Sequence, residues 1–250
     1  MTTMITGKPD ITPMNAALPK KVVFCVPTIT KPFRQTIDSF KASVPLIQAA
    51  GWEDGIVYEI GNPYISAARA TMLRKALDGK ATVIVFIDHD VAWEPGDLLK
   101  LIETEGDVVA GTYRFKNDEE EYRGKLKSNA KGTPLIRESD GAISAEWTPA
   151  GFLKVTREAV SRFMLAYPEL CYGEACSPSV DLFNHGAHER TWWGEDAAFG
   201  RRWKALGGDI WIVPDINLTH HSADRAYPGN LHHYLTRQPG GSEDPAISRL

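Results

Sequence analysis

The chain of 250 residues contains little cysteine and no long apolar run. Its three cysteines, Cys25, Cys171 and Cys176, include no C-x-x-C pair, which argues against a disulfide scaffold and favours a reducing compartment. No segment reaches the length needed to span a bilayer, and the start of the chain lacks the apolar core of a signal peptide. We therefore expect a cytoplasmic protein without a transmembrane segment.

Several motifs of common enzyme classes are also absent. The sequence has no G-x-G-x-x-G after a strand, no G-x-x-x-x-G-K-[ST], no G-x-S-x-G and no H-E-x-x-H. These absences disfavour dinucleotide oxidoreductases, P-loop enzymes, α/β-hydrolases and zincins. The formal net charge is −4, so no overall basic field indicates binding to nucleic acid or to an anionic membrane.

Apolar, β-rich runs alternate with helical patterns through the first half of the chain. Ser66 is the expected cap of the second helix and Gly79 its end. This alternation predicts an α/β fold with a doubly wound, Rossmann-like, mostly parallel sheet flanked by helices, whose ligands bind beyond the carboxyl ends of the strands. The expected strands are 21–29, 55–61, 81–87 and 107–115, and the expected helices are 32–50, 66–79 and 95–106.

The second half is expected to be less regular. A strand-like stretch at 141–156 leads to a helix at 157–170, an irregular segment at 180–193, a last helix at 195–208 and a final strand at 209–221. Segment 116–134 is acidic first and basic afterwards, which is typical of a solvated loop or hairpin, with a flap over the site or an acceptor-binding element as the alternative. We divide the chain into a tail (1–20), one domain (21–222) and a C-terminal extension (223–250).

Two carboxylates, Asp88 and Asp90, follow the apolar run at 83–87. Like charges this close repel, so a divalent cation such as Mg²⁺ or Mn²⁺, shared with phosphate oxygens, is expected to relieve them. The alternative is a pair of turn-forming aspartates that bind backbone amides. His89, which lies between them, is expected to be a spacer.

Further candidate groups lie near the other end of the chain. Glu195 and Asp196 open the expected last helix, either as acidic residues favoured in a first turn or as a general base. Trp192 and Trp193 precede them and could wall a pocket for a sugar face. His220 and His221 end the final strand, and only one of them is expected to face a metal, since successive residues of a strand point opposite ways.

The order of these pieces resembles the GT-A class of nucleotide-sugar-dependent glycosyltransferases, in the broad family-2-like group whose D-x-D motif is matched here by Asp88-His89-Asp90. The resemblance covers 21–222 and implies a GT-A fold with a smaller mixed sheet on the acceptor side. The matching segments are "VPT", "ISAARATML", "FIDHDVAWEPGDL", "VVAGTYRFK", "AGFLKVTREAV", "WGEDAAFGRRWKALGGDIWIVPDI" and "THH".

The resemblance also implies roles for individual residues. Asp90 is the implied ligand of Mn²⁺ or Mg²⁺, Asp88 lies near the ribose or the metal's water shell, and His220 or His221 is the late metal-binding histidine. Asp196, beside Glu195, is the implied catalytic base of an inverting enzyme. The remaining implied contacts are Pro27 and Thr28 with the nucleotide base and ribose, Arg69 and Lys116 with the donor diphosphate, and Gly151 on the acceptor side.

The predicted activity is metal-dependent transfer of a sugar, of the hexosyltransferase type, from a UDP- or GDP-sugar to an acceptor hydroxyl. One alternative is a sugar nucleotidyltransferase, which normally carries a glycine-rich basic loop after its first strand, unlike "VPTITKPFRQT" here. Another is a catalytically silent nucleotide-sugar-binding module. The acceptor stays open among a polysaccharide, a lipid-linked sugar, a protein and a modified nucleic acid, the last not indicated by the net charge.

Overall fold

Successive side chains of the strands β1 (Lys21–Thr28) and β3 (Val83–Ile87) point to opposite faces of the sheet, and both faces are apolar. The computed structural model describes residues 19–238. In β1, Phe24 belongs to one apolar cluster and the next residue, Cys25, to another. β3 divides its side chains between the same two clusters and is buried throughout. Strands buried on both faces have continuously apolar sequences, so these two strands lie inside a sheet with a core on each face.

The central sheet has eight strands, and most of them run in one direction. Only β8 and β7 run in the opposite direction to the other strands, so the mostly parallel α/β sheet expected from the sequence is confirmed. The strands are, in spatial order, β2 (Glu53–Ile60), β1, β3, β8 (Phe152–Thr156), β5 (Val108–Ala110), β13 (Trp211–Ile212), β7 (Ile143–Trp147) and β6 (Lys125–Leu126).

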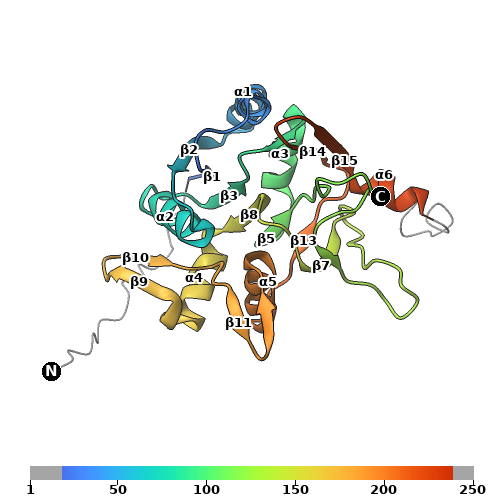
Figure 1. The fold of residues 1–250 in the computed structure, drawn as a ribbon. Helices are drawn as coiled ribbons and strands as arrows, with labels where there is room; N and C mark the ends of the chain where they lie inside the picture. The colour runs from blue at the N-terminus through green and yellow to red at the C-terminus, as the bar shows by residue number, and fades with distance from the viewer. Residues whose placement is uncertain (1–18, 239–250) are drawn as a thin grey trace.

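Helices cover both faces of this sheet (Figure 1). α1 (Arg34–Ala49) and α3 (Pro95–Glu103) pack on the face of Phe24, through residues such as Phe40 and Leu98. The opposite face is covered by α2 (Ile65–Asp78), α4 (Arg157–Ala166) and α5 (Glu195–Ala205), which contribute Met72, Phe163 and Trp203 to the other cluster.

The smaller sheets within the described residues are antiparallel rather than mixed. One of them lies at the site, because its strand β14 (Asn217–His221) ends with the histidine pair and its strand β4 (Val91–Trp93) begins just after Asp90. A short helix, α6 (Leu231–Arg237), follows β15, and a 3₁₀ turn (Pro168–Leu170) follows α4. The small sheets are β15 (Ala226–Asn230)–β14 (Asn217–His221)–β4 (Val91–Trp93), β9 (Cys171–Glu174)–β10 (Ser177–Val180) and β11 (Gly186–His188)–β12 (Thr191–Trp193).

Several local expectations are wrong. Ser66 does not cap α2, which begins at Ile65 with Tyr64 in the capping position and no side-chain cap bond. The stretch 209–221 forms two strands instead of one, since Pro214 and Asp215 separate β13 from β14. The helix at 195–208 is not the last one, because α6 follows it.

Two segments expected to be irregular are partly ordered. Segment 180–193 contains the β11–β12 hairpin, in which Glu189 and Arg190 adopt the left-handed conformation that such tight turns require. Segment 116–134 is largely exposed but carries β6, and ion pairs join Asp118 to Arg225 and Glu120 to Arg237. The extension beyond residue 222 therefore packs against the domain as far as residue 238.

No helix within residues 19–238 is both long and apolar enough to cross a membrane. The expected N-terminal tail up to residue 18, and the end of the C-terminal extension from residue 239, lie outside the described residues.

Candidate active site

The carboxyl end of β3 brings Asp88 into contact with groups from three other segments. Its backbone N–H donates to the carbonyl oxygen of Gly151 at 2.9 Å. Its carboxylate accepts hydrogen bonds from Arg69 of α2 at 3.1 Å and from the Tyr113 hydroxyl, beyond β5, at 2.9 Å. Asp88 is thus held by two donors, and the strand tip is fixed to its surroundings.

Gly151 leaves no room for a side chain at this place. A Cβ atom there would lie 2.1 Å from the Tyr113 hydroxyl oxygen and 2.3 Å from Oδ2 of Asp88. Both distances are far inside van der Waals contact, so the hydrogen bond between Tyr113 and Asp88 depends on glycine at position 151. The structure therefore puts Gly151 directly against one of the two expected aspartates.

Asp90 has a separate set of partners. Its Oδ2 accepts a hydrogen bond from Lys116 at 2.5 Å, and its Oδ1 lies 3.6 Å from Nε2 of His220. Burial acts to raise the pKa of Asp90, but its interactions with His220 and Lys116 outweigh burial and hold the pKa well below its usual range. Asp90 is therefore an ionised, largely buried carboxylate at neutral pH.

His220 is oriented by the backbone. Its Nδ1 lies 2.9 Å from the carbonyl oxygen of Arg114, and because a carbonyl can only accept, Nδ1 must carry the hydrogen. In the neutral ring, Nε2 then presents its lone pair toward Asp90. A histidine fixed through one nitrogen by a backbone carbonyl is the usual arrangement of a metal ligand.

The other two histidines of these motifs lie differently. His221 donates its backbone N–H to the carbonyl oxygen of Asp90 at 2.8 Å, and its ring lies 6.4 Å from that of Phe33. Burial lowers the pKa of His221, although the charge of Asp90 opposes this effect. His89 receives hydrogen bonds at its carbonyl oxygen from the backbone of Phe33 and the hydroxyl of Thr36, so it anchors the start of α1.

Arg69 connects the end of β3 to the start of α5. Its guanidinium donates to Asp88 at 3.1 Å and to Glu195, in the first turn of α5, at 2.6 Å. It is only 2% exposed and stacks 5.0 Å from the ring centroid of Phe183. Burial acts to lower the pKa of Arg69, but the neighbouring carboxylates raise it above its ordinary value. Arg69 therefore stays charged and ties α5 to the tip of β3.

Asp196 stands next to this pair in the first turn of α5. It accepts a hydrogen bond from the backbone N–H of Ala150 at 3.1 Å. Burial, together with the charges of Glu195 and Asp88, raises the pKa of Asp196 to about 7, against the opposing effects of Arg69 and the Ala150 amide. A carboxyl group with such a pKa is suited to exchange protons near neutral pH.

The two tryptophans point to different environments. Trp193 is half-buried, with the His188 ring centroid 3.9 Å and the Arg201 guanidinium 4.8 Å from its own ring. Trp192 is 69% exposed on the same hairpin, and the ring of His185 is 6.3 Å away. Trp192 therefore offers a free aromatic face close to the start of α5, whereas Trp193 anchors the hairpin to that helix.

Pro27 and Thr28 end β1 and are buried. The carbonyl oxygen of Thr28 accepts from the N–H of Gly61, but its hydroxyl is buried and has no hydrogen-bond partner among the described residues. A buried hydroxyl left without a partner is costly, and it marks a place where a ligand could supply one.

Sequence reasoning missed Tyr113 and the backbone of Arg114. Tyr113 is fully buried, donates to Asp88 and places its ring 4.8 Å from that of His220, so it lies between the two carboxylates. Burial raises the pKa of its hydroxyl well above the usual value, and the charges of Asp88 and Asp196 add to this effect. Tyr113 lies three residues beyond the end of β5, and no motif in the sequence marked it.

Asp90 and His220 fit a divalent cation that also has ligands from a substrate. Within residues 19–238, no group of three or more His, Cys, Asp or Glu side chains is placed to hold a metal alone. Two ligands about 2.1 Å from one ion lie about 3.0 to 4.2 Å apart, a range that includes the 3.6 Å between Asp90 Oδ1 and His220 Nε2. Mg²⁺ commonly binds in this way, through one or two protein ligands, water and phosphate oxygens.

No protein-family profile matches the chain, and no curated protein matches it in sequence. Among solved structures, S. aureus TarS 1-349 aligns with a TM-score of 0.40 and 11% identity, over 92% of this chain and 70% of that one. A glycosyltransferase involved in the glycosylation of the major capsid of PBCV-1 aligns with a TM-score of 0.25 and 12% identity, over 55% of this chain and 62% of that one. Similarity at this level assigns no activity.

Proposed function

We propose that the chain is a metal-dependent glycosyltransferase of the GT-A type, which transfers a sugar from a UDP- or GDP-sugar to an acceptor hydroxyl with inversion at the anomeric carbon. The observation that carries this proposal is the pairing of two sites: Asp90 with the backbone-oriented His220, and Asp196 with a pKa of about 7. The first suits a leaving diphosphate, and the second suits an attacking hydroxyl.

Asp90 and His220 would hold Mn²⁺ or Mg²⁺ together with the donor's phosphates. A cation bound there would offset the negative charge that develops on the departing nucleoside diphosphate. Lys116 already contacts Asp90 and is 33% exposed at its side chain, so its ammonium group can turn from the carboxylate to a phosphate oxygen. Asp88, His221 and Arg69 would act around this centre, with Arg69 holding Asp88 rather than reaching the donor itself.

Asp196 would accept the proton of the acceptor hydroxyl. The Ala150 N–H fixes one carboxylate oxygen and leaves the other for the acceptor. Glu195 forms an ion pair with Arg69, which would keep the first turn of α5 in place. In-line attack from the side opposite the diphosphate inverts the anomeric carbon, and retained configuration in the product, measured by NMR, would rule this step out.

The remaining contacts assign the donor and acceptor ends. The unpartnered hydroxyl of Thr28, beside Pro27, would bind the nucleoside. The exposed face of Trp192 would lie against an acceptor sugar, because aromatic faces pack well on the C–H groups of a sugar ring.

A donor panel tests the proposal. UDP- and GDP-sugars are incubated with the protein and Mn²⁺, and release of UDP or GDP is measured with and without chelator. Absence of both release and nucleoside diphosphate binding across the panel would overturn the proposal.

Variants then separate the two halves of the site. Asp90→Asn is expected to lose metal-dependent binding of the nucleoside diphosphate. Asp196→Asn is expected to bind normally and to lose transfer by about 10²- to 10⁴-fold, the usual contribution of a general base. Asp38→Asn, at an exposed aspartate of α1 whose ion pairs within residues 19–238 are with Arg34 and Lys41, is the matched control and should behave like the wild type.

A further inference from the structure

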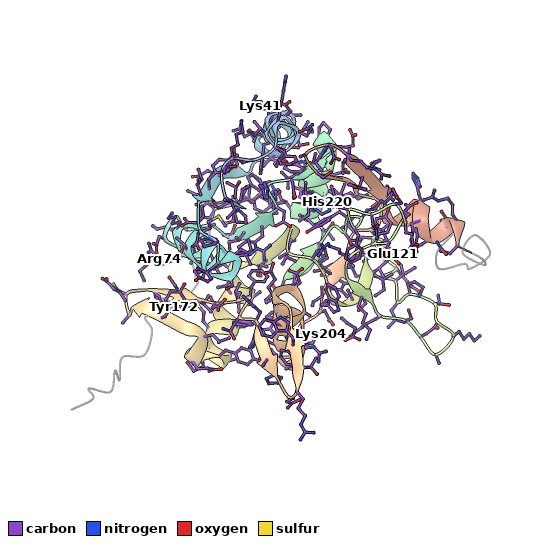
Figure 2. The ribbon with its side chains drawn as sticks, in the orientation of Figure 1. Lys41, Arg74, Glu121, Tyr172, Lys204 and His220 are labelled. Carbon is purple, nitrogen blue, oxygen red and sulfur yellow. The ribbon has the colours of Figure 1, made fainter. Side chains whose placement is uncertain are left out.

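A cavity of about 670 Å³ lies on the reverse face of the small β15–β14–β4 sheet. Along β14, Leu218 belongs to the core and His220 faces Asp90, whereas Asn217 and Thr219 line the cavity. Because successive side chains of a strand point to opposite faces, one sheet separates this cavity from the centre at Asp90. Figure 1 shows β14 and β15 together beside α6, and Figure 2 labels His220 on the inner side of this region.

The lining carries polar groups whose hydrogen-bonding capacity is unused. The hydroxyl of Thr219, the carboxylate of Glu94 and the ring nitrogens of His233 make no hydrogen bond within residues 19–238. The side chains of Asn217 and Asn230 bind one another at 2.9 Å, which leaves further donors and acceptors on both amides.

The charged residues that line the cavity argue against anionic ligands. Glu94 and Glu120 contribute two carboxylates, while Arg237 contributes one guanidinium that is already bound by both oxygens of Glu120 at 2.9 and 3.0 Å. The surplus negative charge disfavours phosphates and acidic sugars. Trp93 donates its indole N–H to Ser43 in the core and is only 6% exposed, so this large ring offers little apolar surface to a lipid.

We propose that this cavity is a second carbohydrate site, which binds a neutral, hydroxyl-rich sugar unit away from the catalytic centre. Unpaired carboxylate and imidazole groups accept hydrogen bonds from sugar hydroxyls, and amides both donate and accept. The volume lies within the usual range of small-molecule sites. The site goes beyond the proposed transfer reaction and does not depend on it.

The cavity also touches the segment that carries Lys116. Glu120 lines the cavity, pairs with Arg237 of α6 and accepts a hydrogen bond from the Tyr122 hydroxyl at 3.0 Å. Lys116, four residues earlier, holds Asp90. A sugar bound to Glu120 would therefore contact the same segment that supplies a cation to the donor site.

Binding is tested with neutral tetrasaccharides in the absence of any donor. Maltotetraose, cellotetraose, mannotetraose and chitotetraose are screened by saturation-transfer NMR, and each positive probe is titrated. Thr219→Val keeps the shape of the strand residue, and Glu94→Ala removes an exposed carboxylate that makes no helix-cap bond. Each is expected to weaken binding about tenfold, the effect of losing one hydrogen bond to a charged or desolvated group. Glu138→Ala, an exposed glutamate outside the cavity, is the control.

Variants of the catalytic centre show whether the probe binds in the cavity or at the catalytic centre. Asp90→Asn and Asp196→Asn should bind the probe as the wild type does. No signal with any of the four probes overturns the proposal, and so does a loss of binding in Asp196→Asn with none in Thr219→Val and Glu94→Ala. Because no nucleotide is present, a protein that fails to release UDP or GDP still gives a readable result here.

Discussion

Replacing Asp196 by asparagine should stabilise the protein at neutral and alkaline pH while abolishing transfer. The folded pKa of Asp196, about 7, lies above the ordinary value of 3.8, so the folded protein favours the protonated carboxyl. The stability that this group contributes is present below pH 3.8 and is lost as the pH rises to 7, since the unfolded chain ionises more readily. At about 1.4 kcal/mol for each tenfold change in proton affinity, the loss approaches about 4 kcal/mol as an upper limit.

Asparagine does not ionise and avoids this loss. It also keeps an oxygen to accept from the Ala150 N–H, so the local hydrogen bond can persist. The assay is urea unfolding of Asp196→Asn and wild type at pH 5 and pH 8. The stabilisation should be larger at pH 8 than at pH 5. A variant that is less stable than the wild type at pH 8, or equally shifted at both values, would refute the reasoning about the buried carboxyl.

The same pKa fixes the pH profile of transfer. A base must be deprotonated, so the rate should rise through pH 7, and at pH 6 it should be about one tenth of its plateau. Values of kcat/KM for nucleoside diphosphate release, from pH 5.5 to 9, measure this, because kcat/KM reports the pKa of the free enzyme. A rate that stays constant down to pH 5.5 would mean that Asp196 is not the base.

Three further outcomes are expected from residues around the same centre. Gly151→Ala forces a Cβ atom into the Tyr113 hydroxyl, and overpacking of this kind costs about 1–3 kcal/mol, so its melting temperature should fall; an unchanged melting curve would show that the contact relaxes freely. Arg69→Met leaves the carboxylates of Asp88 and Glu195 without their buried partner and should lower the free energy of unfolding, measured in urea, by about 3–5 kcal/mol. The surface variant Arg34→Gln should lower it by under about 1 kcal/mol. Similar values for the two variants would contradict the stabilising role of the Arg69 ion pairs. His220→Gln should weaken Mn²⁺-dependent nucleoside diphosphate binding, followed by calorimetry, and unchanged metal dependence would remove His220 from the proposed ligand set.

The regular elements could be predicted because their signals are local. β1 and β3 are continuous apolar runs, and α2 has an apolar face at helical spacing, so each one's type follows from its own residues. Spatial order does not follow in this way. β8 (FLKVT) is inserted antiparallel between β3 and β5, and no local pattern distinguishes that position from any other interior one.

Some candidate site residues also have a local signal in the sequence, whereas others depend on the spatial arrangement. Asp88, Asp90, Asp196 and the pair His220–His221 could be named as candidates in advance because a carboxylate or imidazole after a strand, or in a first helical turn, is visible in the sequence. Which histidine of the pair faces Asp90 followed only from the fold. Tyr113 was missed because its role depends on packing beneath Gly151, which no spacing in the chain reveals.

The sequence by itself determined the main strands and helices of the first half and the placing of charged groups at strand and helix ends, because these depend on side-chain periodicity over a few residues. Only the tertiary structure decided which charge meets which. Lys116 comes to Asp90, Arg69 pairs with Glu195 across 126 positions while it also holds Asp88, and burial rather than sequence context raises the pKa of Asp196. Ion pairing and desolvation depend on distance and burial in space, and both arise only when remote segments pack together.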